Sequence, residues 1–129
     1  MKTMRAADLM TTDVITAKKD TVLTKAMDLL LRWHISGLPV VDEEDNLVGI
    51  ISEIDLVNVT FSGNAADTRV EEVMTRNVTS FAPDSDLAQL IECFSRGRLR
   101  RVPIVENGKV VGIVSRRDIL REMLKRYGG

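Results

Sequence analysis

The sequence predicts an α+β protein made of two pseudo-symmetric β-α-β-β-α repeats that pack sheet against sheet. Three observations lead to this prediction. The chain repeats itself at an offset of 64 residues, each copy carries a helical stripe of apolar residues, and each copy carries two short apolar runs joined by a polar turn. A unit of roughly 60 residues buries too little surface alone, so the two copies are expected to form one domain.

The internal repeat defines the domain organisation. Equivalent residues recur in pairs, among them Met10 and Met74, Val14 and Val78, Asp20 and Asp84, and Pro39 and Pro103. The offset falls to 63 after a one-residue deletion in a polar turn, which a surface turn tolerates. The predicted boundaries are a first repeat at 1–60, a linker of small polar residues at 61–69, and a second repeat at 70–129.

The first half of each repeat is predicted to be a short strand followed by a helix. β-branched residues at 13–16 and 77–80 indicate the strand, and Asp20 and Asp84 stand where a helix N-cap is expected. Apolar residues at helical spacing follow, namely Val22, Ala26, Leu29, Leu30 and Trp33 in one copy and Leu87, Ile91 and Phe94 in the other.

The second half of each repeat is predicted to be a β-hairpin followed by a closing helix. Apolar runs predict the paired strands at 38–41 and 47–51 and at 102–105 and 109–114. Asn107 and Gly108 form the pair that favours a type I′ turn. Amphipathic segments after Ser52 and Ser115 predict the helices.

Composition excludes several classes of protein. With 44% hydrophobic and 29% charged residues and a net charge of −1, the 129-residue chain matches an ordinary globular protein rather than a general polyanion binder. Cys93 is the only cysteine, which excludes an intramolecular disulfide and a thiolate metal cluster. No apolar run reaches the length of a membrane span, and the first ten residues lack a signal-peptide core, so a cytoplasmic location is expected.

The segments GIISEID at 49–55 and GIVSRRD at 112–118, each after an apolar-Pro-apolar strand, resemble the signature of the CBS domain. Two in tandem resemble a Bateman module. The resemblance implies a stand-alone regulatory or sensor module that binds AMP, ADP, ATP or S-adenosylmethionine in the cleft between repeats and modulates a partner protein. It also implies a homodimer that pairs through its helices, with no required cofactor.

Ser52 with Asp55, and Ser115 with Asp118, have two physical interpretations. A serine N-cap with an acidic residue three positions later is the spacing of a capping box. The same geometry offers a helix N-terminus to a phosphate and a carboxylate to the two hydroxyls of a ribose. Both interpretations stay open, since a carboxylate that caps the empty protein can turn to a ribose when the site fills.

The resemblance implies two ligand sites. One combines the loop of the first repeat with the serine and aspartate of the second, namely Val14, Ile15, Ser36, Gly37, Leu38, Pro39, Ser115 and Asp118. The other combines Val78, Thr79, Arg100, Arg101, Val102, Pro103, Ser52 and Asp55. Arg100 and Arg101 stand where the first copy has Ser36 and Gly37; they suit an anionic nucleotide, or else form a solvated basic face. The two sites are expected to differ in affinity.

Other conspicuous residues have structural interpretations. Gly49 and Gly112 lie in strands, where glycine marks close approach of a ligand or, as we favour, of a helix. Met10 and Met74 are expected to fill the core, and Trp33 to pack in the core or a dimer interface.

A metal role is not expected for His34, which suits a cap or the surface. Some apolar helix residues exceed what one small core needs, such as Leu30, Leu31, Phe94 and Leu120.

Catalysis is not expected, because the sequence has neither a P-loop nor a GxGxxG motif, and its single His and Cys have no acidic orienting partner nearby. Two alternatives to a ligand sensor remain. One is a purely structural dimerisation module. The other is a nucleic-acid binder, which the low pI of about 5.8 opposes, using Arg96, Arg98, Arg100, Arg101, Arg116, Arg117 and Arg121.

Overall fold

The computed structural model describes residues 4–60, 64–97 and 99–128. The chain divides into two compact units, one made of Ile15–Val78 and the other of Met1–Val14 together with Thr79–Gly129. These units differ from the repeats expected at 1–60 and 70–129, because residues 1–14 and 70–78 each change sides. Of the expected linker at 61–69, residues 61–63 lie outside the described part of the chain.

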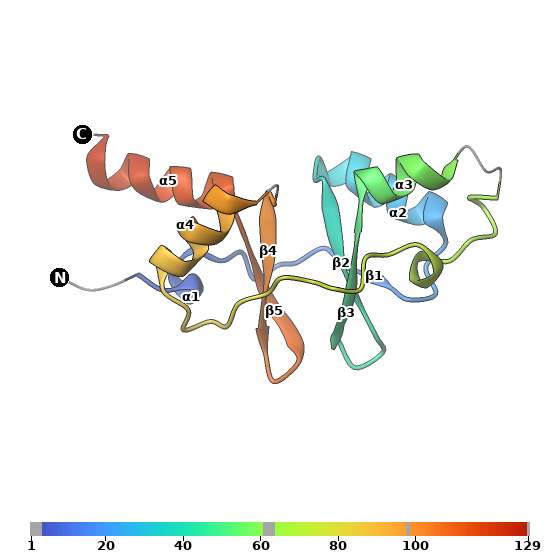
Figure 1. Ribbon diagram of the computed structural model, residues 1–129, viewed down its shortest axis with the longest axis horizontal. Coiled ribbons are helices and arrows are strands. Elements are labelled where there is room, and N and C mark those ends of the chain that lie inside the picture. Colours follow the sequence, from blue (N-terminus) through green and yellow to red (C-terminus); the bar gives the residue numbers. More distant parts are fainter. Residues whose placement is uncertain (1–3, 61–63, 98, 129) are drawn as a thin grey trace. The chain divides into compact units, whose positions relative to one another are not determined.

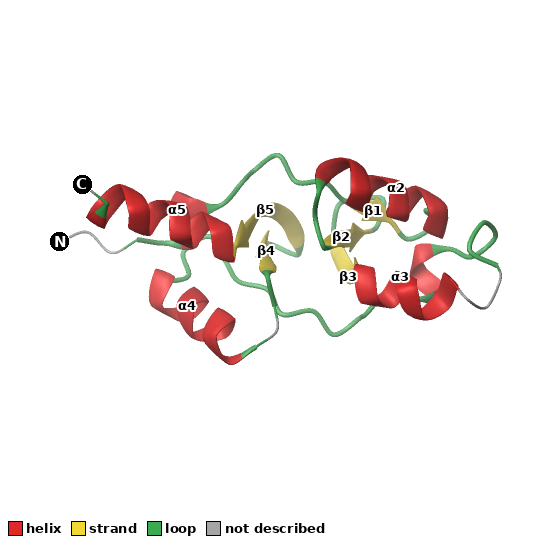
Figure 2. Cartoon of the chain, turned by 90° about the horizontal axis from the view of Figure 1, so that it is seen from above, coloured by secondary structure: helices red, strands yellow, loops and turns green. Residues whose placement is uncertain are grey.

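The unit Ile15–Val78 is a small sheet with helices on one face (Figure 1). Its elements are β1 (Ala17–Lys18), α2 (Leu23–Trp33), β2 (Gly37–Val41), β3 (Leu47–Ser52), α3 (Glu53–Thr60) and the 3-10 helix η1 (Val70–Glu72). Strand β2 is central, parallel to β1 and antiparallel to β3. Figure 2 shows α2 and α3 next to each other beside the sheet. Helix α2 buries Leu23, Ala26 and Leu30, which share one helical face.

The second unit is built on the same plan. Its elements are α1 (Ala6–Leu9), α4 (Leu87–Arg96), β4 (Arg101–Glu106), β5 (Lys109–Ser115) and α5 (Arg116–Tyr127). Strands β4 and β5 form an antiparallel hairpin, and α4 and α5 lie on the same side of it (Figure 1). Asn107 and Gly108 have φ values of 53° and 82°, and positive φ at both positions confirms the predicted type I′ turn. The two hairpins and the two closing helices are therefore confirmed.

The first strand of each repeat was predicted in the wrong place. Residues 13–16 and 77–80 are extended or bent but pair with no strand in the described residues. The pairing begins later, at Ala17–Lys18 in one unit and at a single bridge between Phe81 and Ile104 in the other. Val-Ile-Thr and Val-Thr-Ser have β propensity, but propensity does not determine which residue meets a partner strand.

The predicted N-caps Asp20 and Asp84 are also wrong. The cap residues are Val22 for α2 and Asp86 for α4, so each helix begins three residues after the predicted aspartate. Each aspartate lies in a turn instead, where its carbonyl oxygen accepts a hydrogen bond from an arginine: Arg69 for Asp20, and Arg5 for Asp84.

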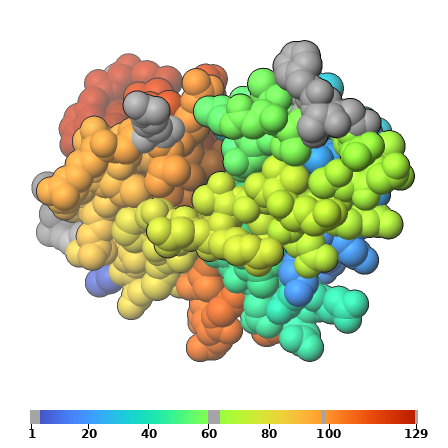
Figure 3. Space-filling model, turned by 45° about the vertical axis from the view of Figure 1, so that its right-hand side comes forward, coloured from blue at the N-terminus to red at the C-terminus, as the bar shows by residue number. Residues whose placement is uncertain are grey.

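The two arginines belong to segments that the repeats exchange, residues 4–14 and residues 68–78. Residues 4–7 bond through their backbone to residues 83–87, and residues 68–71 bond in the same way to residues 19–23. Three bonds in each unit are equivalent. In one unit they join Ala6 N to Ser85 O, Ala7 N to Pro83 O and Leu87 N to Met4 O. In the other unit the corresponding bonds join Val70 N to Thr21 O, Glu71 N to Lys19 O and Leu23 N to Thr68 O. In Figure 3 the second segment runs in yellow-green over the surface of its unit. The first segment of each repeat thus completes the compact unit of the other.

Methionine side chains of the exchanged segments explain the strand glycines. A Cβ added at Gly49 would lie 2.6 Å from Met74 Sδ and 2.9 Å from the carbonyl oxygen of Thr75, and one added at Gly112 would collide with Met10. The predicted core role of the two methionines is confirmed, because Met74 is buried and Met10 packs against the core of its unit. The glycines therefore admit a methionine, not the helix that we favoured.

The apolar surface differs in part from expectation. Leu30 and Phe94 are buried and belong to the cores of the two units, so they are not surplus. Leu31 and Leu120 are exposed, as is Trp33, which is 52% exposed and contributes little to the core.

His34 caps the C-terminal end of α2 with a left-handed φ of 52°, which confirms its structural role. Among the described residues, no helix is both long and apolar enough to cross a membrane.

Candidate functional site

The capping box is present at the start of α3. Asp55 Oδ2 accepts hydrogen bonds from Ser52 N and Ser52 Oγ, both at 3.0 Å, and Asp55 N donates to Ser52 Oγ at 3.2 Å. Asp55 Oδ1 is approached by Thr75 Oγ1 at 3.4 Å. The sequence pattern forms because the serine ends β3 while the aspartate lies in the first turn of the helix, where free N–H groups need acceptors.

The loop before β2 lies beside this capping box. Gly37 is the register partner of Ser52 in the sheet, and Glu53 N donates to the carbonyl oxygen of Ser36 at 3.0 Å. Leu38 and Pro39, the next predicted site residues, are fully buried in β2. Ser36 and Gly37 are partly exposed. Within this unit the structure brings Ser36, Gly37, Ser52 and Asp55 together.

The second capping box opens α5 with the same geometry. Asp118 Oδ2 accepts from Ser115 N at 2.7 Å and from Ser115 Oγ at 3.0 Å, and Asp118 N donates to Ser115 Oγ at 3.2 Å. Asp118 Oδ1 accepts from Arg121 Nη1 at 2.8 Å. The Asp118 side chain is 11% exposed and that of Arg121 is 63% exposed. The capping interpretation of both Ser–Asp pairs is therefore correct for the empty protein.

Arg100 and Arg101 lie beside the second capping box. Arg101 pairs with Ser115 in the sheet, and Arg116 N donates to the carbonyl oxygen of Arg100 at 2.9 Å. The Arg101 Nε–H is buried and has no hydrogen-bond partner among the described residues. Burial lowers the pKa of the Arg101 guanidinium, and the attraction of the Asp118 carboxylate opposes that shift. A buried N–H donor without a protein acceptor can donate to a bound anion such as a phosphate.

The remaining predicted residues are placed as follows. Val14, Ile15 and Val78 are half-buried, and Thr79 is exposed, in the extended segments before the helices. Val102 and Pro103 are fully buried in β4, as their counterparts are in β2. Their side chains belong to the protein interior, so a ligand contact from them would be through the backbone.

The arginines of the second repeat do not form a uniform basic face. Arg96 pairs with Glu92 at 2.7 Å, Arg121 pairs with Asp118, and Arg101 is half-buried. Arg100, Arg116 and Arg117 are exposed. Arg98 lies outside the described residues. Of the six described arginines in this candidate set, Arg96 and Arg121 therefore have ion-pair partners that compete with a phosphate backbone.

Sequence reasoning missed two side chains that touch the capping aspartates. Arg121 is three residues after Asp118 on α5, a helical spacing that predicts contact. Thr75 belongs to the exchanged segment, and its bridge with Ile50 carries it to Asp55. No local pattern signals that contact, because it depends on how distant parts of the chain fold together.

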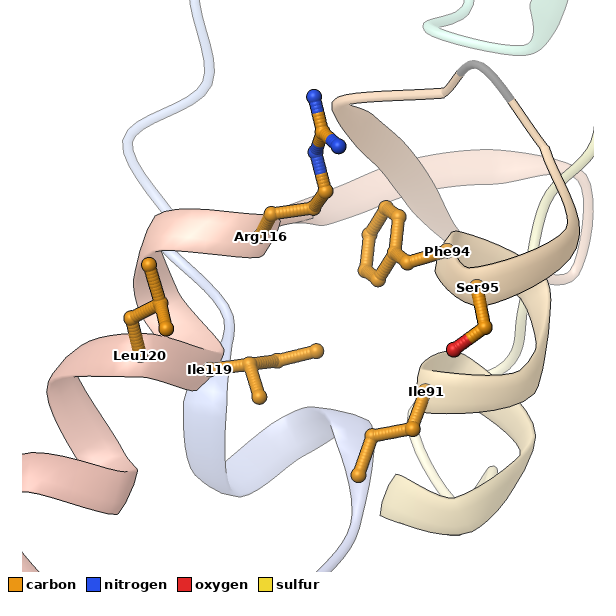
Figure 4. A pocket seen from close by; sticks show the side chains of 6 residues that line it. All are labelled: Ile91, Phe94, Ser95, Arg116, Ile119 and Leu120. Carbon is orange, nitrogen blue, oxygen red and sulfur yellow. The ribbon is translucent and has the colours of Figure 1, made fainter.

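Two of the surface pockets formed by described residues each lie within a single unit. One, of about 280 Å³, is a groove between α4 and α5, lined by Ile91, Phe94, Ser95, Arg116, Ile119 and Leu120 (Figure 4). The other, of about 380 Å³, is lined by Lys18, Lys19, Asp20, Val41, Asp42, Glu43 and Glu71. Neither is lined by the Ser–Asp pairs. In the described part of the chain, no group of three or more His, Cys, Asp or Glu side chains could hold a metal ion.

Two copies of one small α+β unit, each with a Ser–Asp box, define a tandem repeat of a single domain type. The CBS domain model matches residues 6–61 and 70–125, and the chain belongs to the CBS domain family. It is a tandem CBS pair, or Bateman module, and the predicted fold class is confirmed. Inosine-5′-monophosphate dehydrogenase of Methanocaldococcus jannaschii is 35% identical over 118 residues, which are 91% of this chain but 23% of that enzyme.

Solved structures of CBS pairs match nearly the whole chain. CBSX2 of Arabidopsis thaliana, in complex with AMP, has a TM-score of 0.86 at 27% identity, with 95% of this chain and 97% of that chain covered. The CBS domain pair of protein MJ0100, in complex with 5′-methylthioadenosine and S-adenosyl-L-methionine, has a TM-score of 0.83 at 31% identity, with 97% and 99% covered. Relatives with this fold thus bind ligands that contain adenosine.

Proposed function

We propose that this chain is a regulatory sensor that binds an adenine nucleotide or S-adenosylmethionine and thereby modulates a partner protein. The observation that carries the proposal is the duplicated Ser–Asp box at the starts of α3 and α5. In each box one carboxylate oxygen is used by the cap, and the other retains capacity to accept. The AMP and S-adenosylmethionine complexes of similar CBS pairs support the ligand class.

Each proposed site is shared between the repeats, as the family resemblance implies. One joins the loop at 36–39 to Ser115 and Asp118, and the other joins the loop at 100–103 to Ser52 and Asp55. The carboxylate accepts from the ribose hydroxyls, while the helix N-terminus and the arginines attract phosphate. Ligand binding would bias the partner through the difference in affinity between two states of the module.

The proposal is tested by calorimetric titration of the protein with AMP, ADP, ATP and S-adenosylmethionine. Saturable binding of at least one of them below millimolar concentration is expected. If all four fail to bind, the proposed function is wrong. A gel shift at low and high salt tests the nucleic-acid alternative, for which a shift at low salt that is lost at high salt would be the signature.

Arg101→Met is expected to weaken AMP binding by about tenfold or more, because a charge-assisted hydrogen bond to phosphate contributes roughly 1.5–3 kcal/mol. Binding of 5′-methylthioadenosine, which has no phosphate, should change less than about twofold. Calorimetry with both ligands measures the difference. Arg117→Met, which removes an equally positive but exposed side chain from the same unit, is the control. Equal losses for both ligands would mean that Arg101 supports the fold instead of the phosphate.

We also propose that the module pairs with a second copy of itself through its helices. In one unit, exposed apolar side chains lie on α5, namely Leu120 at 66%, Leu124 at 69% and Tyr127 at 78%. In the other unit they lie on α3, with Ile54 at 71% and Val57 at 60%, and on α2, with Leu31 at 75%. Beside Leu120 lies the groove of Figure 4, in which Ile119 points from α5 towards α4. Apolar patches of this kind mark interaction surfaces.

Leu120→Glu is expected to convert a dimer into a monomer, because it places a charge in the proposed apolar interface. Sedimentation velocity measures the change. Lys125→Glu, an exposed charge reversal on the same helix, should leave the dimer intact. A monomeric wild-type protein, or a dimeric Leu120→Glu variant, would contradict the proposed interface.

The proposed role is non-catalytic and cytoplasmic. Cys93 is the only cysteine of the sequence and is free, which fits a reducing compartment. A chemical reaction catalysed by the purified protein on any of the four ligands would overturn the non-catalytic part of the proposal.

A further inference from the structure

The two capping aspartates are not equivalent. In unit Ile15–Val78 the outer oxygen of Asp55, Oδ1, meets only the Thr75 hydroxyl at 3.4 Å among the described residues. In the other unit, Asp118 Oδ1 is bound by Arg121 Nη1 at 2.8 Å. The residue that corresponds to Arg121 in the first repeat is Asn58, which carries no charge. One carboxylate therefore has a cationic partner three residues ahead on its helix, and the other has none in the described structure.

The inner oxygens have no capacity left for a ligand. Each Oδ2 accepts from a serine N–H and from the same serine hydroxyl, and these two donors use its two lone pairs. Only the outer oxygens can accept from a ribose. At Asp55 the outer oxygen is nearly free, because 3.4 Å is beyond the usual range of about 2.5–3.0 Å for an O–H···O bond. At Asp118 the guanidinium of Arg121 occupies one of the two lone pairs of the outer oxygen, Oδ1.

We propose that Arg121 competes with the ligand's ribose for Asp118, so that Asp55 is the stronger of the two diol-binding carboxylates and the site containing Asp118 fills at higher ligand concentration. This inference rests on the proposed function and adds to it an order of binding. Arg121 is a positioning residue in this scheme. It lowers the affinity of one site through its contact with Asp118 and does not touch the ligand.

The exposure of the ion pair limits the size of the effect. The Arg121 side chain is 63% exposed, so it can leave the carboxylate and be solvated when a ligand arrives. The Asp118 side chain is only 11% exposed, but its cationic partner is largely solvated, and ion pairs of that kind on a helix contribute little, which predicts a difference in affinity of about two- to fivefold from this residue alone. Arg121 therefore lowers the affinity of the Asp118 site and does not close it.

The test exchanges the two residues. Arg121→Asn and Asn58→Arg are titrated calorimetrically with 5′-methylthioadenosine, a neutral probe that has both ribose hydroxyls and no phosphate for an arginine to attract. To isolate the Asp118 site, Arg121→Asn is also measured in the Asp55→Ala background. We expect Arg121→Asn to tighten binding at the Asp118 site about two- to fivefold and Asn58→Arg to weaken binding at the Asp55 site by a similar factor. Arg121→Lys should keep the weaker affinity.

Binding of 2′,3′-dideoxyadenosine should be insensitive to both exchanges, which a merely structural role of Arg121 would not predict. If the wild-type protein binds no adenosine ligand, the proposed function fails. If it binds but Arg121→Asn leaves the Asp118 site unchanged or weaker, the competition is wrong while the proposed function stands. Should Arg121→Asn fail to fold, the Asn58→Arg exchange decides, because no loss of affinity there also contradicts the competition.

Discussion

Replacing Asp55 by alanine is expected to weaken binding of an adenine nucleotide by at least about tenfold at the stronger site. The carboxylate accepts from ribose hydroxyls through Oδ1, and hydrogen bonds to a charged group contribute roughly 1.5–3 kcal/mol. Asp118→Ala should have the same kind of effect at the weaker site. Titration calorimetry with AMP measures both losses, and thermal unfolding of each variant measures the loss of the cap.

A control in the same unit separates capping from binding. Glu72 accepts from Arg69 N at 2.6 Å in the manner of a capping box, but it lies outside the proposed site. Glu72→Ala should lower the melting temperature and leave AMP affinity unchanged. If Asp55→Ala and Asp118→Ala behave in the same way as Glu72→Ala, the two aspartates are helix caps and nothing more.

Gly49→Ala is expected to destabilise the protein by about 1–3 kcal/mol, the usual cost of overpacking a core. The new Cβ would meet both Met74 Sδ and the carbonyl oxygen of Thr75, and the second is backbone held by its bridge to Ile50. Gly112→Ala should cost less, because the nearest atoms that it meets all belong to the flexible side chain of Met10. Urea unfolding measures the free energy of unfolding of each variant.

Gly37→Ala provides the comparison, since its Cβ would be 3.5 Å from the nearest atom, an ordinary van der Waals distance. Its unfolding free energy should change far less than that of Gly49→Ala. Equal stability of Gly49→Ala and the wild-type protein would show that the exchanged segment does not pack tightly on β3.

Features with a local signal were predictable from the sequence. Apolar runs predict both hairpins, the Asn107-Gly108 pair predicts the turn of the second hairpin, and the Ser-x-x-Asp spacing predicts the two capping boxes. The start of α2 was misplaced because Asp20 is a good cap by residue type. The turn that contains Asp20 is followed by extended backbone at Val22, which forms a bridge with Arg69, and the Lys18 N–H donates to the Thr21 hydroxyl.

Features that depend on distant segments were not predictable. The repeat identifies two copies, but not that residues 4–7 bond to residues 83–87 while residues 68–71 bond to residues 19–23. The contact of Thr75 with Asp55 depends on the same exchange. Within one copy, Trp33 and Leu30 share an apolar pattern, yet only Leu30 is buried, whereas Trp33 is the last residue of α2 and is 52% exposed.

In the proposed function, a helix-capping carboxylate also receives the ribose of a bound nucleotide. A crystal structure of the protein with AMP tests it most directly. We predict a ribose hydroxyl oxygen within about 2.5–3.0 Å of Asp55 Oδ1, with Ser52 still bonded to Oδ2. AMP bound elsewhere, for example in the groove between α4 and α5, or bound with its ribose turned away from both Asp55 and Asp118, would contradict the account.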